Sequence, residues 1–428
     1  VAGLVAGIVY YKQVEEERKL SLIYIPKVVD GTNDFWTSLI QGAEMAAKEY
    51  NIKKVFVPFQ NAYEGSVVDG VDVLPAKNVM DVLAHIKGEK VIESVKYDFD
   101  AEEETKYNVD FSDVKGQDQA KRALEIAAAG GHNCLLIGPP GSGKSMLAKR
   151  LPTILPDMTF EERLETSKVY SIAGKIPSGK SLVTKRPFRS PHHTVSAQAL
   201  TGGGANPKPG EISLAHNGVM FMDEFPEFDR RAKESLRQPL EDGVVTISRA
   251  AGTFTYPSNI MLVAAMNPCP CGYFGHPTRQ CTCSPAAKKR YQDKVSGPLL
   301  DRIDIHVEVA PVEYNELSDN NEGEKSSDIK KRVDKARAIQ QKRFAGTGIT
   351  CNAKMTPKMT KECCVLSKEA DELLHESFDN FSMSARAYDK VLRLARTIAD
   401  LADSEEIKLE HIAEALQFRA LDRKYWEV

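Results

Sequence analysis

The sequence Gly138-Pro139-Pro140-Gly141-Ser142-Gly143-Lys144-Ser145 matches the pattern G-x-x-x-x-G-K-[ST]. The apolar run Cys134-Leu135-Leu136-Ile137 precedes it and is long enough for a buried strand, and residues 146–151 are typical of the first turns of a helix. A strand, a glycine-rich turn and a helix in this order are the context in which the pattern binds phosphate. The stretch therefore predicts a nucleotide site in an α/β fold.

The chemistry of this loop depends on its glycines and on the two residues that end it. Glycine lets backbone N–H groups turn toward a phosphate, and the helix N-terminus adds partial positive charge. We expect Lys144 to reach the β- and γ-phosphates of ATP, and the Ser145 hydroxyl to ligate Mg²⁺. The expected nucleotide-binding residues are Gly138, Pro139, Pro140, Gly141, Ser142, Gly143, Lys144, Ser145 and Met146.

Two acidic residues end a second apolar strand. Residues 218–222 are apolar and run directly into Asp223 and Glu224. A Mg²⁺·ATP site needs a carboxylate at a strand end, which we assign to Asp223. Hydrolysis also needs a group that orients and deprotonates the attacking water, which we assign to Glu224. The pair is therefore predicted to lie beside the glycine-rich loop.

A third apolar strand, residues 260–266, ends in Asn267. A polar residue at the carboxyl end of a parallel strand, beside the phosphate loop, can hold the attacking water or the γ-phosphate. On its own, an Asn at this place is usually a turn former. The order of the three strands favours the interpretation of Asn267 as a sensor of the γ-phosphate.

Two arginines complete the expected catalytic set. Arg302 ends a helix before the strand at residues 305–309, from where its charge can stabilise the transition state in a neighbouring subunit. A surface arginine paired with Asp301 or Asp304 is an equally good interpretation. Arg386 opens the amphipathic helix at residues 387–401 and can contact the phosphates from a helical lid.

Residues 166–210, which we call the basic stretch, contain no Asp or Glu, although 60 of the 428 residues are acidic. The stretch is rich in Gly and Pro and interrupts the core. Its cationic loop favours sequence-independent, salt-sensitive nucleic-acid binding; structural ion pairs or contacts to the nucleotide are the rival interpretation. The candidate contacts to DNA are Lys185, Arg186, Arg189, His192 and His193.

Four of the eight cysteines form one cluster: Cys269 and Cys271, then nine residues, then Cys281 and Cys283. Four thiolates on a short loop can close a tetrahedral Zn²⁺ site. The spacing counts against zinc, because zinc hairpins usually leave at least two residues between paired cysteines. Reduced thiols in a rigid loop are the alternative.

Composition sets outer limits on the function. A hydrophobic content of 42% with 27% charged residues is typical of soluble globular proteins, and 428 residues suggest several domains. Scattered cysteines favour a reducing, cytoplasmic environment. Residues 1–11 are apolar but too few to span a bilayer, and the end of a clipped signal or membrane anchor and a short buried strand are equally good interpretations. No membrane is expected as a partner of the chain.

Together these motifs resemble an AAA+ ATPase, more narrowly the magnesium-chelatase-like ComM/YifB family, over residues 51–425. The most specific marks are residues 186–193 (RPFRSPHH), 209–218 (PGEISLAHNG) and 267–272 (NPCPCG). The resemblance implies a P-loop AAA+ core with a parallel sheet flanked by helices, a C-terminal helical lid and a hexameric ring with nucleotide between subunits. It also implies Arg302 as arginine finger, Arg386 as sensor 2, and a basic stretch facing the pore.

The family is associated with DNA processing, including branch migration during natural transformation. We therefore expect an ATP-dependent motor acting on DNA. One alternative is a chelatase-type ATPase that remodels a protein partner for metal insertion, and another is a nucleotide-binding module that forms no ring.

The family's N-terminal domain resembles the Lon protease domain. Residues 1–50 resemble instead the start of a sugar-type periplasmic binding protein, so the Lon-like domain is expected to be partial. No Ser–Lys dyad is identified, and proteolysis is not expected.

The expected domain boundaries follow from these assignments. They are an N-terminal α/β region at residues 1–97, an acidic linker at 98–113, the ATPase core at 114–315 with the basic stretch inside it, and a helical linker and lid at 316–428.

Overall fold

The computed structural model of the chain describes residues 9–10, 21–22, 54–59, 62, 72–95, 107–176, 182–204, 207–249, 252–311, 323–380, 383–419, 421 and 425–426. The interpretation of residues 1–50 as a binding-protein fragment concerns a segment that, apart from four residues, lies outside this set. The same holds for residues 98–106 of the acidic linker. Among the described residues, no helix combines the length and apolar character needed to cross a membrane.

The chain divides into two compact units. The first comprises residues 1–105, 160–184 and 204–208, and the second comprises 106–159, 185–203 and 209–428. In the first unit, strands β3 and β4 pair in parallel and β1 and β2 pair antiparallel. Its elements are β1 (Val9–Tyr10), β2 (Ser21–Leu22), β3 (Lys54–Pro58), β4 (Asp72–Ala76), α3 (Val79–Ile86) and α6 (Phe160–Ile172).

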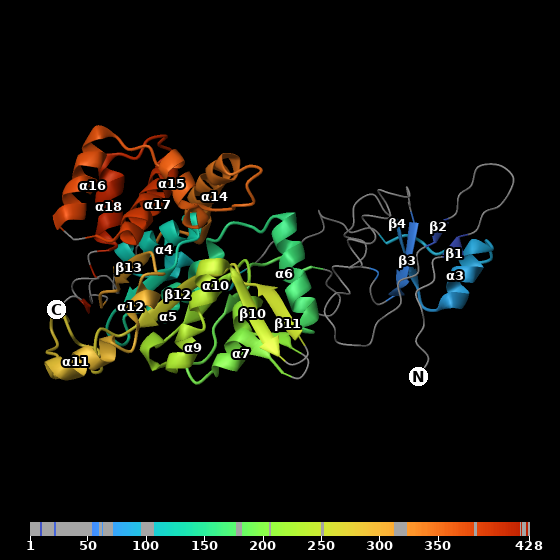
Figure 1. The fold of residues 1–428 in the computed structure, drawn as a ribbon, viewed down its shortest axis with the longest axis horizontal. Helices are drawn as coiled ribbons and strands as arrows, with labels where there is room; N and C mark the ends of the chain where they lie inside the picture. The colour runs from blue at the N-terminus through green and yellow to red at the C-terminus, as the bar shows by residue number, and fades with distance from the viewer. Residues whose placement is uncertain are drawn as a thin grey trace. The chain divides into compact units, whose positions relative to one another are not determined.

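The second unit is built on a five-stranded sheet of order β13-β5-β12-β9-β6, with every neighbouring pair parallel. The strands are β5 (Cys134–Ile137), β6 (Phe188–Arg189), β9 (Val219–Met222), β12 (Met261–Met266) and β13 (Ile305–Glu308). Strands β5, β9 and β12 are buried along their whole length, which is why they read as continuous apolar runs. Helices cover this sheet (Figure 1), and the expectation of a mixed α/β fold of AAA+ type is confirmed.

Because all five strands are parallel, the sheet has two chemically different edges. Gly138, Asp223 and Asn267 follow the carboxyl ends of β5, β9 and β12. Asn133 lies at the opposite, amino edge, where its side chain amide donates to the carbonyl of Arg302 at 2.8 Å. The sheet therefore brings the expected phosphate-side residues to one edge and the expected arginine finger to the other.

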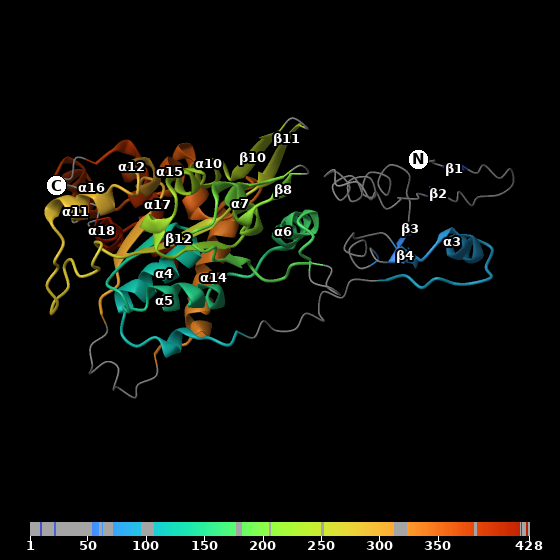
Figure 2. The ribbon, with the colours of Figure 1, turned by 90° about the horizontal axis from the view of Figure 1, so that it is seen from below.

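Short helices and one hairpin connect these strands. The hairpin of β10 and β11 extends from the surrounding helices (Figure 2), and it was not among the elements expected from the sequence. The connecting elements are η2 (Phe111–Asp113), α5 (Lys144–Arg150), η3 (Leu151–Thr153), α7 (Ala197–Thr201), β7 (Gly202–Gly203), β8 (Lys208–Pro209), α8 (Glu211–Leu214), η4 (Phe225–Glu227), α9 (Arg230–Glu234), α10 (Arg237–Asp242), β10 (Val244–Arg249), β11 (Gly252–Pro257), α11 (Pro285–Gln292) and α12 (Gly297–Leu300).

Part of the basic stretch belongs to the core sheet. The expectation that this stretch interrupts the core as a loop-rich segment is therefore wrong for Phe188 and Arg189. Phe188 and Arg189 form β6, which pairs with Val219 and Met220 of β9. The Phe188 ring also stacks on Phe221 with ring centroids 6.0 Å apart. A two-residue edge strand has too little periodicity to be recognised from sequence.

The C-terminal helices pack beside α4 (Figure 1), as expected for a C-terminal helical region. Helix α14 is tied to the end of α4, because the Arg337 guanidinium donates to the Ala128 carbonyl at 2.9 Å and the Gln340 amide donates to Ala129 at 3.1 Å. The helices of this region are α4 (Asp118–Gly130), α14 (Ser326–Arg343), η5 (Asn352–Lys354), α15 (Pro357–Cys363), α16 (Lys368–Asn380), α17 (Ala385–Leu401) and α18 (Leu409–Gln417).

Asp400 on α17 is the centre of a buried polar network within these helices. Its carboxylate accepts two hydrogen bonds from Arg343, at 2.6 and 2.8 Å, one from Arg396 at 3.0 Å and one from Asn352 at 2.8 Å. Both Asp400 and Arg396 are almost fully buried. Removing one member of such a network leaves charges in a medium that solvates them poorly.

We predict that Asp400→Ala lowers the free energy of unfolding by about 3–5 kcal/mol, because two arginines lose their buried counter-ion. Chemical denaturation followed by circular dichroism measures this change. Asp379→Ala, at an exposed position on α16, serves as the control and should leave the midpoint nearly unchanged. A small effect of Asp400→Ala, equal to that of the control, would contradict the assignment.

Candidate nucleotide site

The glycine-rich loop joins β5 to α5 with the backbone geometry that phosphate binding requires. Gly141 and Gly143 have φ values of +78° and +89°, which side chains other than glycine rarely adopt. A Cβ added at Gly138 would lie 2.3 Å from the carbonyl oxygen of Val309, so this position also requires glycine. The Ser142 hydroxyl is buried with no hydrogen-bond partner among the described residues.

Lys144, the first residue of α5, is buried inside this loop. Its ammonium donates to the carbonyls of Gly138 at 2.7 Å and Pro139 at 2.8 Å, and to the side chain oxygen of Asn267 at 3.3 Å. Burial lowers the pKa of Lys144 to about 8, and the nearby Asp223 opposes that shift. The loop therefore holds the poorly solvated Lys144 ammonium beside the Ser142 hydroxyl, which has no hydrogen-bond partner among the described residues. These two groups fit the oxygens of a bound phosphate.

Ser145 and Asp223 meet although 77 residues separate them in the sequence. The Ser145 hydroxyl donates to the Asp223 carboxylate at 2.5 Å. A hydroxyl and a carboxylate are the hard oxygen ligands that Mg²⁺ takes beside nucleotide phosphates. The donor set thus fits a Mg²⁺ ion, with Ser145 and Asp223 as the residues that would hold it.

Glu224 follows in a left-handed backbone conformation, with φ of +51°. This conformation is unusual for a residue other than glycine and turns the chain sharply after β9. The side chain is 59% exposed, and its carboxylate lies 3.1 Å from Nδ1 of His193. The His193 ring in turn packs edge-on against Phe228. His193, which the sequence suggested as a DNA contact, therefore lies against Glu224, the expected general base of hydrolysis.

A pocket of about 440 Å³ opens beside Glu224 and Asn267. Its wall includes three residues of the α11 region that sequence reasoning missed: Arg290, Tyr291 and Lys294. Burial raises the pKa of the Tyr291 hydroxyl, which hydrogen-bonds to the backbone of Asn267. The run Lys288-Lys289-Arg290, which begins five positions after the last clustered cysteine, was the signal in the sequence for this cationic wall.

Arg302 and Arg386 lie at the amino edge of the sheet, away from the glycine-rich loop of their own chain. Strand β5, about 13 Å long, separates Asn133, which bonds to Arg302, from Gly138. Arg302 forms an ion pair with Glu241, a pairing that sequence reasoning missed in favour of Asp301 or Asp304. A hydrogen bond from Arg302 lowers the pKa of Glu241, and the exposed Arg386 adds a smaller electrostatic contribution in the same direction.

A buried ion pair fixes this arginine edge to the start of α17. The Lys390 ammonium lies 3.5 Å from the Asp304 carboxylate and donates to the Ile303 carbonyl at 3.0 Å. Burial opposes ionisation of Asp304, but Lys390, His132 and the backbone N–H of Asn133 hold its pKa well below the usual range. Burial lowers the pKa of Lys390 to about 8. Arg386, one turn before Lys390, is thereby held near Arg302.

Residues 110–317 match the family model "Magnesium chelatase, subunit ChlI", and residues 323–419 match the model of its C-terminal part. The uncharacterized protein YifB of Escherichia coli is 43% identical over 373 residues, which are 87% of this chain and 72% of YifB. The chain belongs to the magnesium-chelatase-like YifB/ComM family.

Two other relatives of this family member have names that refer to a biological process, competence in one case and DNA replication licensing in the other. The competence protein ComM of Haemophilus influenzae is 41% identical over 386 residues, which are 88% of this chain and 74% of ComM. The maternal DNA replication licensing factor mcm6 of Xenopus tropicalis is 21% identical over 345 residues, covering 73% of this chain and 36% of mcm6.

In this YifB/ComM family member, two of the five residues expected to contact DNA bind other parts of the protein instead. Arg186 donates to backbone carbonyls of Pro156 at 2.6 Å and Asn217 at 2.8 Å. Arg189 pairs with Glu211 at 2.6 Å. The sequence left open whether these two arginines bind DNA or make structural contacts within the protein. In the structure both make contacts within the protein. Lys185 and His192 are exposed.

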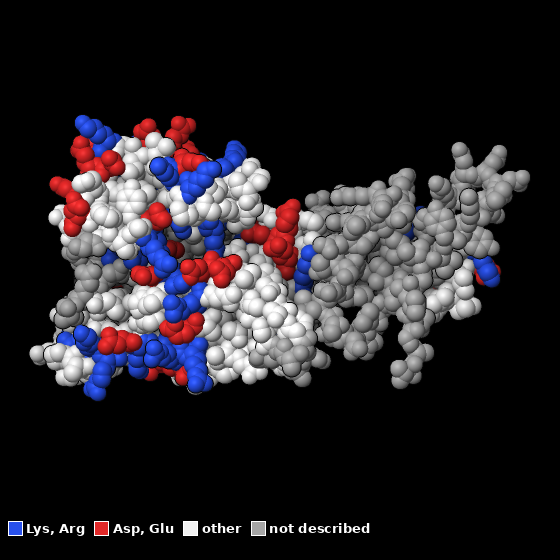
Figure 3. Space-filling view, viewed as in Figure 1, with Lys and Arg blue, Asp and Glu red and all other residues white. Residues whose placement is uncertain are grey.

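A larger basic surface lies elsewhere on this YifB/ComM-type fold. Lys and Arg side chains gather over α11 and α9 (Figure 3), and sequence reasoning did not single this surface out. The exposed cations of these two helices are Arg230, Arg231, Lys289 and Arg290, and the exposed Lys294 lies just after α11.

We predict that Lys144→Ala abolishes nucleotide binding, because it removes the one ammonium inside the loop, whereas Glu224→Gln retains binding and loses turnover. Fluorescence titration with an ATP analogue measures the first property, and phosphate release measures the second. Glu227→Gln is a matched control, since Glu227 lines the same pocket but pairs with Lys294. Rapid hydrolysis by Glu224→Gln would refute its role as the base.

Proposed function

We propose that this chain is an ATP-driven motor that acts on DNA, with each active site completed by a second copy of the chain. The observation that carries the proposal is the separation of the two halves of the site, because Lys144 and Arg302 lie at opposite edges of one parallel sheet. The relatives named for competence and for DNA replication support DNA as the substrate.

ATP binding is the first step. The ammonium of Lys144 exchanges the loop carbonyls, which are neutral acceptors, for phosphate oxygens, which carry charge and bind it more strongly. The glycine-rich backbone and the Ser142 hydroxyl face the same phosphates. Ser145 and Asp223 are the residues that would hold a Mg²⁺ ion, which would supply positive charge to neutralise the phosphates.

Hydrolysis follows from the residues at the carboxyl edge. The Glu224 carboxylate orients a water and takes its proton, and Asn267, bonded to Lys144, holds the γ-phosphate side of the site. Arg302 and Arg386 of the neighbouring copy exchange Glu241 for the phosphate, where delocalised positive charge stabilises the transition state. This requires a ring or another closed assembly, for which the family resemblance implies a hexamer.

The contact between His193 and Glu224 supplies a route from DNA to the active site. His193 sits beside His192, with ring centroids 4.1 Å apart, and the exposed His192 belongs to the segment we expect to meet DNA. A phosphate that draws His192 or Lys185 outward also shifts His193. Glu224 then loses a hydrogen-bond partner and becomes free to activate water, so DNA binding accelerates hydrolysis.

A second candidate, a chelatase-type ATPase that remodels a protein partner for metal insertion, is supported by the description of the matching family model. The two candidates differ in their stimulating ligand. A DNA motor hydrolyses ATP faster with branched DNA, and its DNA affinity falls steeply with salt. A chelatase-type remodeller responds to its protein partner and not to DNA.

We predict that branched DNA raises the ATPase rate of the wild-type chain and that His193→Ala removes this stimulation while ATP affinity stays within about twofold. The reason is that His193 contacts the Glu224 carboxylate, which acts on water, whereas Lys144 and the glycine-rich loop bind the phosphates. A malachite-green phosphate assay with and without a synthetic four-way junction measures the effect at several salt concentrations.

The matched control is His375→Ala, an exposed histidine on α16 that should keep full stimulation. The double variant Lys185→Ala plus His192→Ala should weaken DNA binding and flatten its salt dependence, because about one phosphate contact per cation is lost. An ATPase rate that DNA leaves unchanged at all salt concentrations would contradict the DNA proposal.

A further inference from the structure

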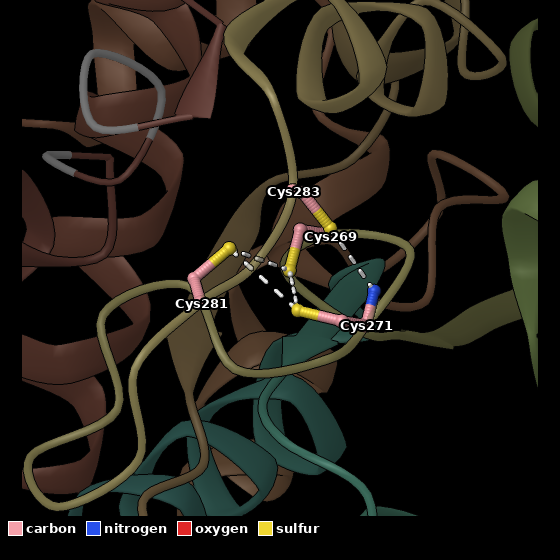
Figure 4. Close-up of side chains that lie close together, drawn as sticks. All are labelled: Cys269, Cys271, Cys281 and Cys283. Atoms are coloured by element: carbon pink, nitrogen blue, oxygen red, sulfur yellow. Dashed lines mark hydrogen bonds between the residues drawn. The ribbon is translucent and has the colours of Figure 1, made fainter.

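The four clustered cysteines converge on one point although they come from two separate segments of the loop between β12 and α11 (Figure 4). The sulfur of Cys269 lies 3.4 Å from that of Cys271 and 3.7 Å from that of Cys281, and Cys271 and Cys281 are 3.6 Å apart. All four sulfur atoms, including that of Cys283, lie within 4.8 Å of one another. The four side chains are free cysteines.

These distances match a mononuclear tetrahedral site. A zinc–sulfur bond of about 2.3 Å places the sulfurs of a regular tetrahedron about 3.8 Å apart. A disulfide would bring two sulfurs to about 2.05 Å, far closer than any pair here. The one-residue spacing within each pair, which argued against zinc in the sequence, is overcome because Cys281 packs across the loop against both Cys269 and Cys271.

The surrounding backbone is arranged for negatively charged sulfur. The Cys271 N–H donates to the Cys283 sulfur at 3.4 Å. Backbone N–H groups of Gly272 and Phe274 face the Cys269 sulfur, and those of Tyr273 and Thr282 face Cys271. His276 lies outside this group of four ligand atoms, and its Nδ1 accepts from the N–H groups of Thr278 and Arg279. Such N–H donors are typical outer partners of metal-bound thiolates.

We propose that Cys269, Cys271, Cys281 and Cys283 bind one Zn²⁺ ion, and that this ion holds the γ-phosphate side of the nucleotide site in place. On binding, each of the four thiols gives its proton to solvent and forms a sulfur–zinc bond, with no change of oxidation state. Soft thiolate ligands select zinc among abundant divalent ions. The sulfurs are too close together for a multi-iron cluster, which spreads its thiolates around several metal atoms.

The position of the loop gives the ion its effect on the nucleotide site. A Cβ added at Gly272 would lie 2.4 Å from Cδ of Pro140, so the cysteine loop packs directly on the phosphate-binding loop. Asn267 lies just before the first cysteine, and α11 begins at Pro285, just after the last. Zinc therefore fixes both ends of the pocket wall that carries Asn267 and Arg290. This second part rests on the proposed nucleotide site, whereas zinc binding itself does not.

The test is metal analysis of the full-length chain, purified under reducing conditions without added metal, by inductively coupled plasma mass spectrometry. We expect about one zinc per chain in the wild type and in the control Cys363→Ser, a cysteine outside the cluster. Cys281→Ser should lower zinc retention against a competing chelator by roughly tenfold or more.

A second measurement on the wild type does not depend on whether the variant folds. Stripping the metal with a chelator should weaken ATP-analogue binding, and adding Zn²⁺ back should restore it. Equal zinc in Cys281→Ser and Cys363→Ser, stoichiometric iron in place of zinc, or disulfides among the four cysteines would overturn the metal assignment. Zinc present but without influence on nucleotide affinity would overturn only the coupling to the nucleotide site.

Discussion

The parallel orientation of β5, β12 and β9 is the constraint on which the rest of this structure depends. Parallel strands end at the same edge of a sheet, so three segments far apart in sequence deliver Lys144, Asn267 and Asp223 to one place. The 2.5 Å hydrogen bond from Ser145 to Asp223 and the 3.3 Å contact from Lys144 to Asn267 are the direct result. Full burial of these strands stabilises the arrangement and keeps the lysine poorly solvated.

The same constraint places the arginines where their own chain cannot use them. The residue before β13 lies at the amino edge because β13 runs parallel to β5. The buried Asp304–Lys390 pair then attaches α17 to this edge and carries Arg386 to the side of Arg302. A sheet with all its strands parallel thus separates the phosphate-binding residues from the arginines, which is the separation on which the proposal of a second copy rests.

Sequence reasoning was most successful where chemistry is carried by short, contiguous motifs. The predicted strand at residues 134–137 coincides with β5, and the glycine-rich loop and the Asp223–Glu224 pair directly follow the carboxyl ends of β5 and β9, as expected. The roles of the site residues remain predictions, and only their positions are observed. Contiguous motifs work because a strand of four buried residues and the turn that follows it leave few alternatives.

Contacts between segments that are distant in sequence could not be predicted from the sequence. The sequence around Arg186 does not show that its guanidinium donates to the carbonyls of Pro156 and Asn217. The sequence around Phe188 likewise does not show that this residue pairs with β9. The contact of His193 with Glu224 depends on how the basic stretch returns to the sheet. The spacing of the cysteines likewise gave no sign of their convergence, because Cys271 and Cys281 meet across the loop in space. Tertiary packing decides all of these contacts, and one sequence does not contain a local signal for them.

The central claim, that Arg302 works on the nucleotide of a neighbouring copy, is tested most directly by mixing two inactive variants. Arg302→Ala keeps an intact phosphate side, and Glu224→Gln keeps an intact arginine side, so a mixed assembly contains some complete sites. After subunit exchange with ATP, with assembly checked by light scattering, the mixture should hydrolyse ATP well above the sum of the two variants measured alone. A mixture that assembles and yet stays at that sum would contradict an active site shared between two chains.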